Sequence, residues 1–81
     1  MTHIVLITRE ECNYCDNAKH ALGTYGFAYQ EKLIGYDIER EEVLKKYPGR
    51  KMLPVVVIND ECIGGMEELN TWLVSGVYDE T

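Results

Sequence analysis

Short apolar runs without polar alternation mark the strands that this chain is expected to form. Residues 3–8 are rich in β-branched side chains, as is typical of a strand buried on both faces of a sheet. Residues 54–58 have the same character, with a proline first, where it removes no hydrogen bond from the middle of a sheet. Residues 28–34, with weaker patterning, and residues 61–63 are predicted to form two more strands.

Apolar side chains at helical spacing mark three helices. A helix over residues 13–25 is followed by a glycine, and a shorter helix over residues 39–47 is ended by a Pro-Gly pair. The last helix opens at Gly64-Gly65 and closes at Gly76. The side chains predicted to face the core from these helices are Cys15, Ala18, Leu22, Tyr25, Val43, Leu44, Tyr47, Met66, Leu69, Trp72 and Leu73.

The order of these elements predicts a mixed sheet in one domain over residues 1–81. A βαβ unit with a right-handed crossover requires its two strands to be parallel. The two-residue turn Asn59-Asp60 instead makes the last two strands antiparallel. We therefore expect an α/β fold, βαβ followed by ββα, in which a four-stranded mixed sheet carries helices on both faces.

The charge of the chain narrows the classes of partner. Fourteen acidic against eight basic residues give a net charge of −6, which disfavours general nucleic-acid binding. No apolar run approaches the length of a membrane span or of an export signal, so we expect no membrane partner and a cytoplasmic location. Half of the basic residues fall within seven positions and would form either a solvated helix end or a local anion site; they are Lys45, Lys46, Arg50 and Lys51.

Three cysteines are the candidates for chemistry. An odd number fits poorly with a secreted disulfide scaffold. Cys12 and Cys15 form a Cys-x-x-Cys pair at the end of the first strand and the start of the first helix, which suggests redox chemistry. Half a zinc site and two inert core cysteines are the alternatives, although the other zinc ligands available, Cys62, His3 and His20, are scattered.

The position of the pair suits thiol chemistry. The attacking species is the thiolate, and the unpaired N–H groups at a helix N-terminus stabilise an anion. We therefore expect a lowered pKa for the Cys12 thiol, with Arg9 adding positive charge nearby. Cys15 lies one turn deeper on the same helix face, as suits a resolving partner that closes the disulfide.

Three motifs in the same order resemble those of the glutaredoxin family. Residues 12–15, Cys-Asn-Tyr-Cys, resemble the Cys-Pro-Tyr-Cys of dithiol glutaredoxins, and residues 15–19 are especially similar to the small phage-encoded members. Residues 52–54, Met-Leu-Pro, are similar to the family's Thr-Val-Pro, and residues 62–69 to its Ile-Gly-Gly-Cys-Asp-Asp-Leu stretch. The resemblance covers about residues 3–75, and its departures are Asn13 for Pro, Met52 for Thr and Met66 for Cys or an aromatic residue.

The resemblance implies a thioredoxin fold and a glutathione-dependent thiol–disulfide oxidoreductase. In the family the first cysteine attacks a mixed disulfide and the second resolves it, which assigns these roles to Cys12 and Cys15. Glutathione is then the reducing co-substrate, with no tightly bound cofactor and no metal. Disulfide-containing or glutathionylated proteins are the partners of a monomeric enzyme, and ribonucleotide reductase is one candidate. A phage-encoded protein of this kind would act in the host cytoplasm.

The resemblance also implies a glutathione groove. Arg9 and Tyr14 border it in the family's pattern, and the Leu53 backbone pairs with the cysteinyl part, next to a Leu53-Pro54 bond that is expected to be cis. The γ-glutamyl end lies over the helix start at residues 65–67. The glycyl carboxylate needs a cation, for which Arg9, Arg50 and Lys51 are open alternatives. The implied glutathione-binding residues are Arg9, Tyr14, Leu53, Pro54, Gly65, Met66 and Glu67.

The same resemblance leaves two other functions open. Some glutaredoxins hold an iron–sulfur cluster in a dimer, through the first cysteine and glutathione. That behaviour is commoner where the second cysteine is replaced, and Cys15 is present here. A redoxin reduced by thioredoxin reductase is the other alternative, but such proteins generally lack the glutathione segment at residues 64–68.

Overall fold

The structure is a computed structural model that describes residues 2–48 and 53–76. The order of its strands and helices is the one predicted from the sequence, and the boundaries differ by no more than two residues. In chain order the elements are β1 (Ile4–Thr8), α1 (Asn13–Thr24), β2 (Gln30–Leu33), α2 (Arg40–Lys46), β3 (Val55–Ile58), β4 (Glu61–Gly64) and α3 (Met66–Ser75).

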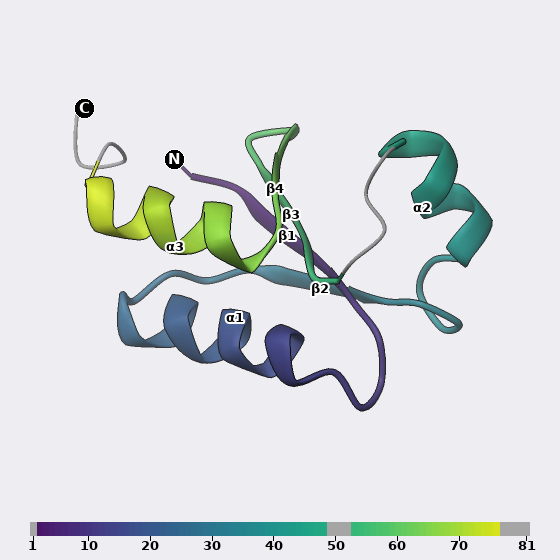
Figure 1. The fold of residues 1–81 in the computed structure, drawn as a ribbon, viewed down its shortest axis with the longest axis horizontal. Coiled ribbons are helices and arrows are strands. Elements are labelled where there is room, and N and C mark those ends of the chain that lie inside the picture. The colour runs from purple at the N-terminus through teal and green to yellow at the C-terminus, as the bar shows by residue number, and fades with distance from the viewer. Residues whose placement is uncertain (1, 49–52, 77–81) are drawn as a thin grey trace.

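The four strands form one mixed sheet in the order β2-β1-β3-β4. β1 pairs in parallel with β2, with Val5 opposite Gln30, and antiparallel with β3, with Ile4 opposite Ile58. β3 and β4 are antiparallel, as the turn between them predicts. Figure 1 shows α1 and α3 lying together and α2 well away from them. The predicted four-stranded mixed sheet with helices on both faces is therefore confirmed.

The central strands β1 and β3 are buried on both faces, as their unbroken apolar runs predict. Alternate side chains of each strand enter two separate cores. The larger core lies under α1 and α3, and its buried members are Ile4, Leu6, Ala18, Leu22, Val56, Ile58, Leu69 and Leu73. The smaller core lies under α2, and its buried members are Ile7, Ile38, Val43, Val55 and Val57.

Two of the residues predicted to face the core are exposed instead. Tyr25 is 47% exposed because it caps the C-terminus of α1, beyond the last buried position, Leu22. Leu44 is also 47% exposed, because the seven-residue α2 buries only Val43. Both predictions were wrong for the same reason: the last turn of a helix and a short helix do not bury a full apolar stripe.

A polar cluster ties α1 to the sheet. The Thr8 side chain is completely buried, and its hydroxyl donates a 2.6 Å hydrogen bond to Oε2 of Glu31. Nζ of Lys19 donates to the same oxygen at 3.1 Å. The Thr8 hydrogen bond, followed by that of Lys19, lowers the pKa of Glu31, and the hydrogen bond to Glu31 raises the pKa of Lys19. The cluster thus joins β1, α1 and β2 just before the chain reaches Cys12.

Replacing Glu31 with Gln is expected to lower the free energy of unfolding by about 1 kcal/mol at pH 7. Because folding lowers the Glu31 pKa, its contribution is full above the ordinary carboxyl value of 4.5 and is lost as the pH falls through the lowered value. Urea unfolding between pH 7 and pH 3 should therefore show the difference shrinking in acid. Glu61→Gln, at an exposed position, is the control and should have little effect at any pH. A Glu31→Gln difference of equal size throughout that range would contradict the account.

Candidate active site

Cys12 is the N-cap residue of α1. Its backbone is extended, with φ −123° and ψ 106°, and its carbonyl accepts the Asp16 N–H at 3.1 Å, which begins the helix. Its Sγ accepts a 3.1 Å hydrogen bond from the Cys15 N–H. The sulfur therefore takes the place that a Ser, Asp or Asn oxygen usually takes at a helix start.

Cys12 and Cys15 are joined by a disulfide, with their Cα atoms 5.2 Å apart. Cys12 is 7% exposed and Cys15 is 1% exposed, so a substrate sulfur reaches Cys12 more easily. This order of exposure is the one that the sequence predicts. Cys62 is a free, half-buried thiol on β4.

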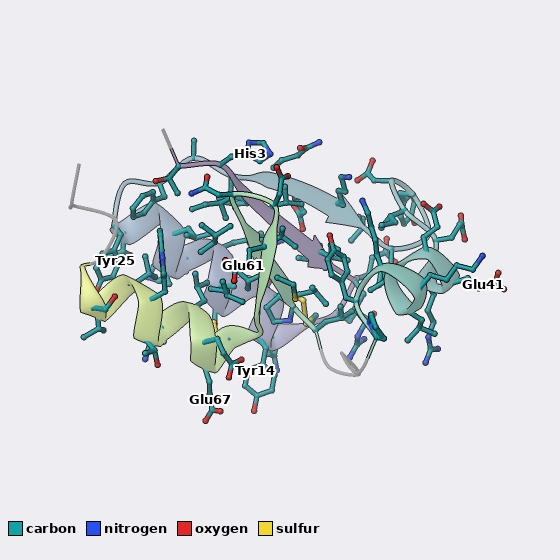
Figure 2. The ribbon with its side chains drawn as sticks, turned by 90° about the horizontal axis from the view of Figure 1, so that it is seen from above. His3, Tyr14, Tyr25, Glu41, Glu61 and Glu67 are labelled. Atoms are coloured by element: carbon teal, nitrogen blue, oxygen red, sulfur yellow. A yellow bond between two sulfur atoms is a disulfide. The ribbon has the colours of Figure 1, made fainter. Side chains whose placement is uncertain are left out.

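A groove of about 850 Å³ opens beside Cys12. Three segments far apart in the sequence form it: the loop before α1 with the first turn of that helix, residues of α2 with Ile34, and Leu53 before β3. Figure 2 shows the Tyr14 ring projecting outward from the start of α1. The residues that line the groove are Arg9, Glu11, Cys12, Asn13, Tyr14, Ile34, Arg40, Val43, Leu44 and Leu53.

The structure brings together only some of the residues that the resemblance assigned to glutathione. Arg9, Tyr14 and Leu53 line the groove with Cys12. Pro54 is buried behind them, and the Leu53-Pro54 bond is cis, as predicted.

The other assigned residues, Gly65, Met66 and Glu67, form the start of α3 and do not line this groove. Glu67 lines a separate hollow on α3 and points away from the molecule in Figure 2. Of the basic cluster, Lys45 and Lys46 are exposed in the last turn of α2, whereas Arg50 and Lys51 lie outside the described residues.

Arg40 is the groove residue that the sequence reasoning missed. It is the first residue of α2, where its cationic side chain lies at the positive end of the helix dipole. Carboxylates are favoured at that position, and Glu41 and Glu42 follow the usual pattern. A cation in the first turn of the helix predicted over residues 39–47 was the signal that could have marked Arg40. With Arg9 it gives the groove two guanidinium groups.

The loop before Cys12 carries two acidic residues in different environments. The Tyr36 hydroxyl donates a 2.9 Å hydrogen bond to Oε1 of Glu10, and this bond raises the pKa of Tyr36. The Glu10 carbonyl accepts from Nη1 of Arg9 at 3.3 Å. Glu11 is exposed, lines the groove and has a positive φ of 54°.

The junction of β4 and α3 is built around Gly64. Its φ is +130°, and a Cβ at this position would lie 2.5 Å from Oε1 of Glu68. That carboxylate accepts the Gly65 N–H at 2.7 Å, as in half of a capping box. The Glu68 carboxylate therefore closes the start of α3, and both Glu67 and Glu68 are exposed.

Residues 4–63 match the model of the family described as Glutaredoxin. The chain belongs to the glutaredoxin family. It is 37% identical over 70 residues to Glutaredoxin 3 of Escherichia coli K12, an alignment that covers 85% of this chain and 83% of that protein. It is 32% identical over 68 residues to Glutaredoxin 1 of Rickettsia conorii, with coverage of 82% and 67%.

Solved glutaredoxins share the fold. Glutaredoxin 1 from Francisella tularensis, solved with cacodylate, superposes with a TM-score of 0.78 at 24% identity, and the alignment covers 99% of this chain and all of that one. Reduced Escherichia coli glutaredoxin superposes with a TM-score of 0.73 at 26% identity, with coverage of 95% and 98%. The predicted thioredoxin fold is confirmed.

The family and the Cys12–Cys15 pair together establish the activity. The protein is a dithiol glutaredoxin, a thiol–disulfide oxidoreductase, and glutaredoxins use glutathione as their reductant. In residues 2–48 and 53–76, no helix has the length and apolar character needed to cross a membrane.

Replacing Gly64 with Ala is expected to cost about 1–3 kcal/mol of the free energy of unfolding, because the new side chain is strained at positive φ and displaces Glu68. Gly23→Ala is the matched control. Gly23 lies inside α1 with no atom within 4 Å of an added Cβ, so the change should stabilise this glutaredoxin by about 0.5–1 kcal/mol. Thermal unfolding of both variants measures the two effects, and a stable Gly64→Ala protein would contradict this account of the junction.

Proposed function

We propose that this glutaredoxin removes glutathione from mixed disulfides with Cys12 as the nucleophile and reduces protein disulfides with Cys12 and Cys15 together. The observation that carries the assignment is the place of the Cys12 sulfur, which caps α1 and accepts the Cys15 N–H. The same N–H and the helix dipole favour the negative charge of a thiolate at that atom. Cys15 is deeper and less exposed, as suits the second, resolving step.

The proposed reaction moves two electrons through Cys12. Its thiolate attacks the glutathione sulfur of a mixed disulfide, the substrate S–S bond breaks, and the substrate thiolate leaves and takes a proton. The thiolate of a second glutathione then attacks the glutathione sulfur on Cys12, which releases glutathione disulfide and the Cys12 thiolate. With a protein disulfide, the Cys12 thiolate attacks one sulfur, the protein S–S bond breaks and one protein thiolate leaves. The Cys15 thiolate then attacks the Cys12 sulfur, which releases the second protein thiolate and forms the Cys12–Cys15 disulfide. Two glutathione molecules reduce that disulfide and leave as glutathione disulfide.

We propose that the groove beside Cys12 is the binding site for the backbone of glutathione. Arg9 and Arg40, which both line the groove, supply two cations for the glycyl carboxylate. The Leu53 backbone and the Tyr14 ring border the cysteinyl part, and Pro54 supports that wall from inside.

The γ-glutamyl end is proposed to reach the start of α3. The first N–H groups of a helix lack partners within the helix and bind carboxylates readily. Gly65, Met66 and Glu67 form that start, and the exposed Glu67 carboxylate is the one placed to meet an ammonium group. Glu68 is proposed to have only the capping role, since its carboxylate holds the Gly65 N–H.

The finer partners and the location of the protein are also part of the proposal. We propose a monomer without a tightly bound cofactor that acts in the cytoplasm on glutathionylated and disulfide-containing proteins. Ribonucleotide reductase is one candidate among them. The net charge of −6 supports the view that nucleic acid is not a partner.

The two cysteine variants separate the two proposed roles. Cys12→Ser should abolish turnover with every disulfide, because no other thiol caps a helix in the described part of the chain. Cys15→Ser should still remove glutathione from a mixed disulfide but fail to reduce a protein's internal disulfide efficiently. Both activities are measured with glutathione and glutathione reductase, and then with thioredoxin reductase as the electron source. Equal loss of both activities in Cys15→Ser, or turnover only with thioredoxin reductase, would overturn the proposal.

Arg40→Gln should raise the KM for a glutathione mixed disulfide about tenfold, or roughly 1.4 kcal/mol, through loss of a carboxylate partner. The increase should shrink as salt is added, because the pair is partly exposed and screened. Lys45→Gln removes the same charge from the opposite end of α2, outside the groove, and serves as the control. A KM that rises equally in both variants would show that the total positive charge of α2, and not a contact with Arg40, attracts the substrate.

A further inference from the structure

Glu11 is the nearest charged neighbour of the nucleophile along the chain, directly before Cys12. Its side chain is exposed and lines the groove. Its φ of 54° lies in the left-handed region, which a glutamate seldom occupies, so the loop fixes the direction in which residue 11 leaves the backbone. An anionic group is therefore held at the mouth of the site.

Among the residues that the structure describes, none bonds to the carboxylate of Glu11. Glu10, one residue earlier, is held by the Tyr36 hydroxyl at 2.9 Å. Within residues 2–48 and 53–76, Glu11 takes part in no hydrogen bond or salt bridge. Arg9, the cation nearest to it in sequence, instead directs Nη1 to the Glu10 carbonyl. Glu11 is left to interact with whatever approaches Cys12.

We propose that Glu11 is a specificity-determining residue that favours substrates with a cationic side chain next to the reacting cysteine and disfavours acidic ones. The inference rests on the proposed function, because it concerns the protein half of a mixed disulfide attacked by Cys12. For the attack, the substrate sulfur must reach Cys12, and the residues flanking it in the substrate then come close to Glu11. A cationic substrate side chain close to the Glu11 carboxylate is attracted and an acidic one is repelled, which changes the rate at which substrate and enzyme meet productively.

The two halves of a mixed disulfide meet different charges at this site. The glutathione half carries carboxylates, and the groove offers Arg9 and Arg40 for them. Glu11 lines the same groove and directly precedes Cys12 in the chain, so we place its carboxylate beside the protein half at the reacting sulfur. Two substrates that share the glutathione half and differ in the flanking charge of the protein half therefore isolate the effect of Glu11.

The reacting step is the same for both substrates. The Cys12 thiolate forms a bond to the glutathione sulfur, the bond between that sulfur and the peptide sulfur breaks, and the peptide thiolate leaves with the electron pair and takes a proton. Glutathione then reduces Cys12 and leaves as glutathione disulfide. Glu11 exchanges no proton or electron in this sequence; it changes only how often the peptide approaches productively.

The test uses two glutathionylated peptides, one with Lys and one with Glu on both sides of the single cysteine. The unmodified protein should show a kcat/KM about tenfold higher for the Lys peptide at low salt, and the ratio should fall as salt rises. Glu11→Gln should reduce that ratio about fivefold. Glu11→Asn removes the same charge and keeps the backbone conformation, because asparagine tolerates a positive φ. It should reduce the ratio as much as Glu11→Gln does. Glu41→Gln, an exposed change of equal charge on α2 outside the groove, should leave the ratio unchanged.

Each other outcome overturns a stated part of the account. An unchanged ratio in both Glu11 variants, with normal turnover, would overturn the role of Glu11 and leave the proposed function intact. An equal fall in Glu41→Gln would assign the preference to net charge and also overturn it. No turnover of either peptide by the unmodified protein would overturn the proposed function and the inference with it.

Discussion

The hydrogen bond from the Cys15 N–H to the Cys12 sulfur is the interaction on which the arrangement of the site depends. It requires residue 12 to be extended while residue 13 is already helical, so the chain changes conformation at the reactive atom. A sulfur in this position faces the unpaired N–H groups of the first turn, where negative charge is stabilised. The helix then buries Cys15 one turn further in, which gives the two thiols unequal exposure.

The sheet delivers Cys12 to that point because its central strands are buried on both faces. β1 packs under α1 and α3 on one side and under α2 on the other, and the Thr8–Glu31–Lys19 cluster fixes its end. α2 contributes little to the interior, since only Val43 is buried in it. Three of its residues, Arg40, Val43 and Leu44, line the groove beside Cys12. The short helix α2 thus contributes more residues to the groove than to the buried core.

Most of the fold could be predicted from the sequence, because buried strands and amphipathic helices leave periodic apolar patterns. Tyr25 and Leu44 were misplaced because periodicity does not reveal where a helix stops being covered. The cysteine pair was found because a Cys-x-x-Cys at a strand-to-helix junction has a chemical reason for its spacing. Glu11 was missed as a groove residue because tertiary packing decides which segments meet across a groove, and a single exposed charge does not reveal it. Arg40 was missed although a cation in the first turn of a helix is unusual.

The most direct test of the central claim is the pH dependence of alkylation of the reduced protein, with the modified cysteine identified by mass spectrometry. The account predicts that iodoacetamide reacts first at Cys12, with half-maximal rate at a pH well below the roughly 8.5 of an ordinary cysteine. Cys15 and Cys62 should remain largely unmodified under the same conditions. A Cys12 profile centred near the ordinary value, or faster reaction at Cys15, would contradict the claim that the start of α1 creates the reactive thiolate.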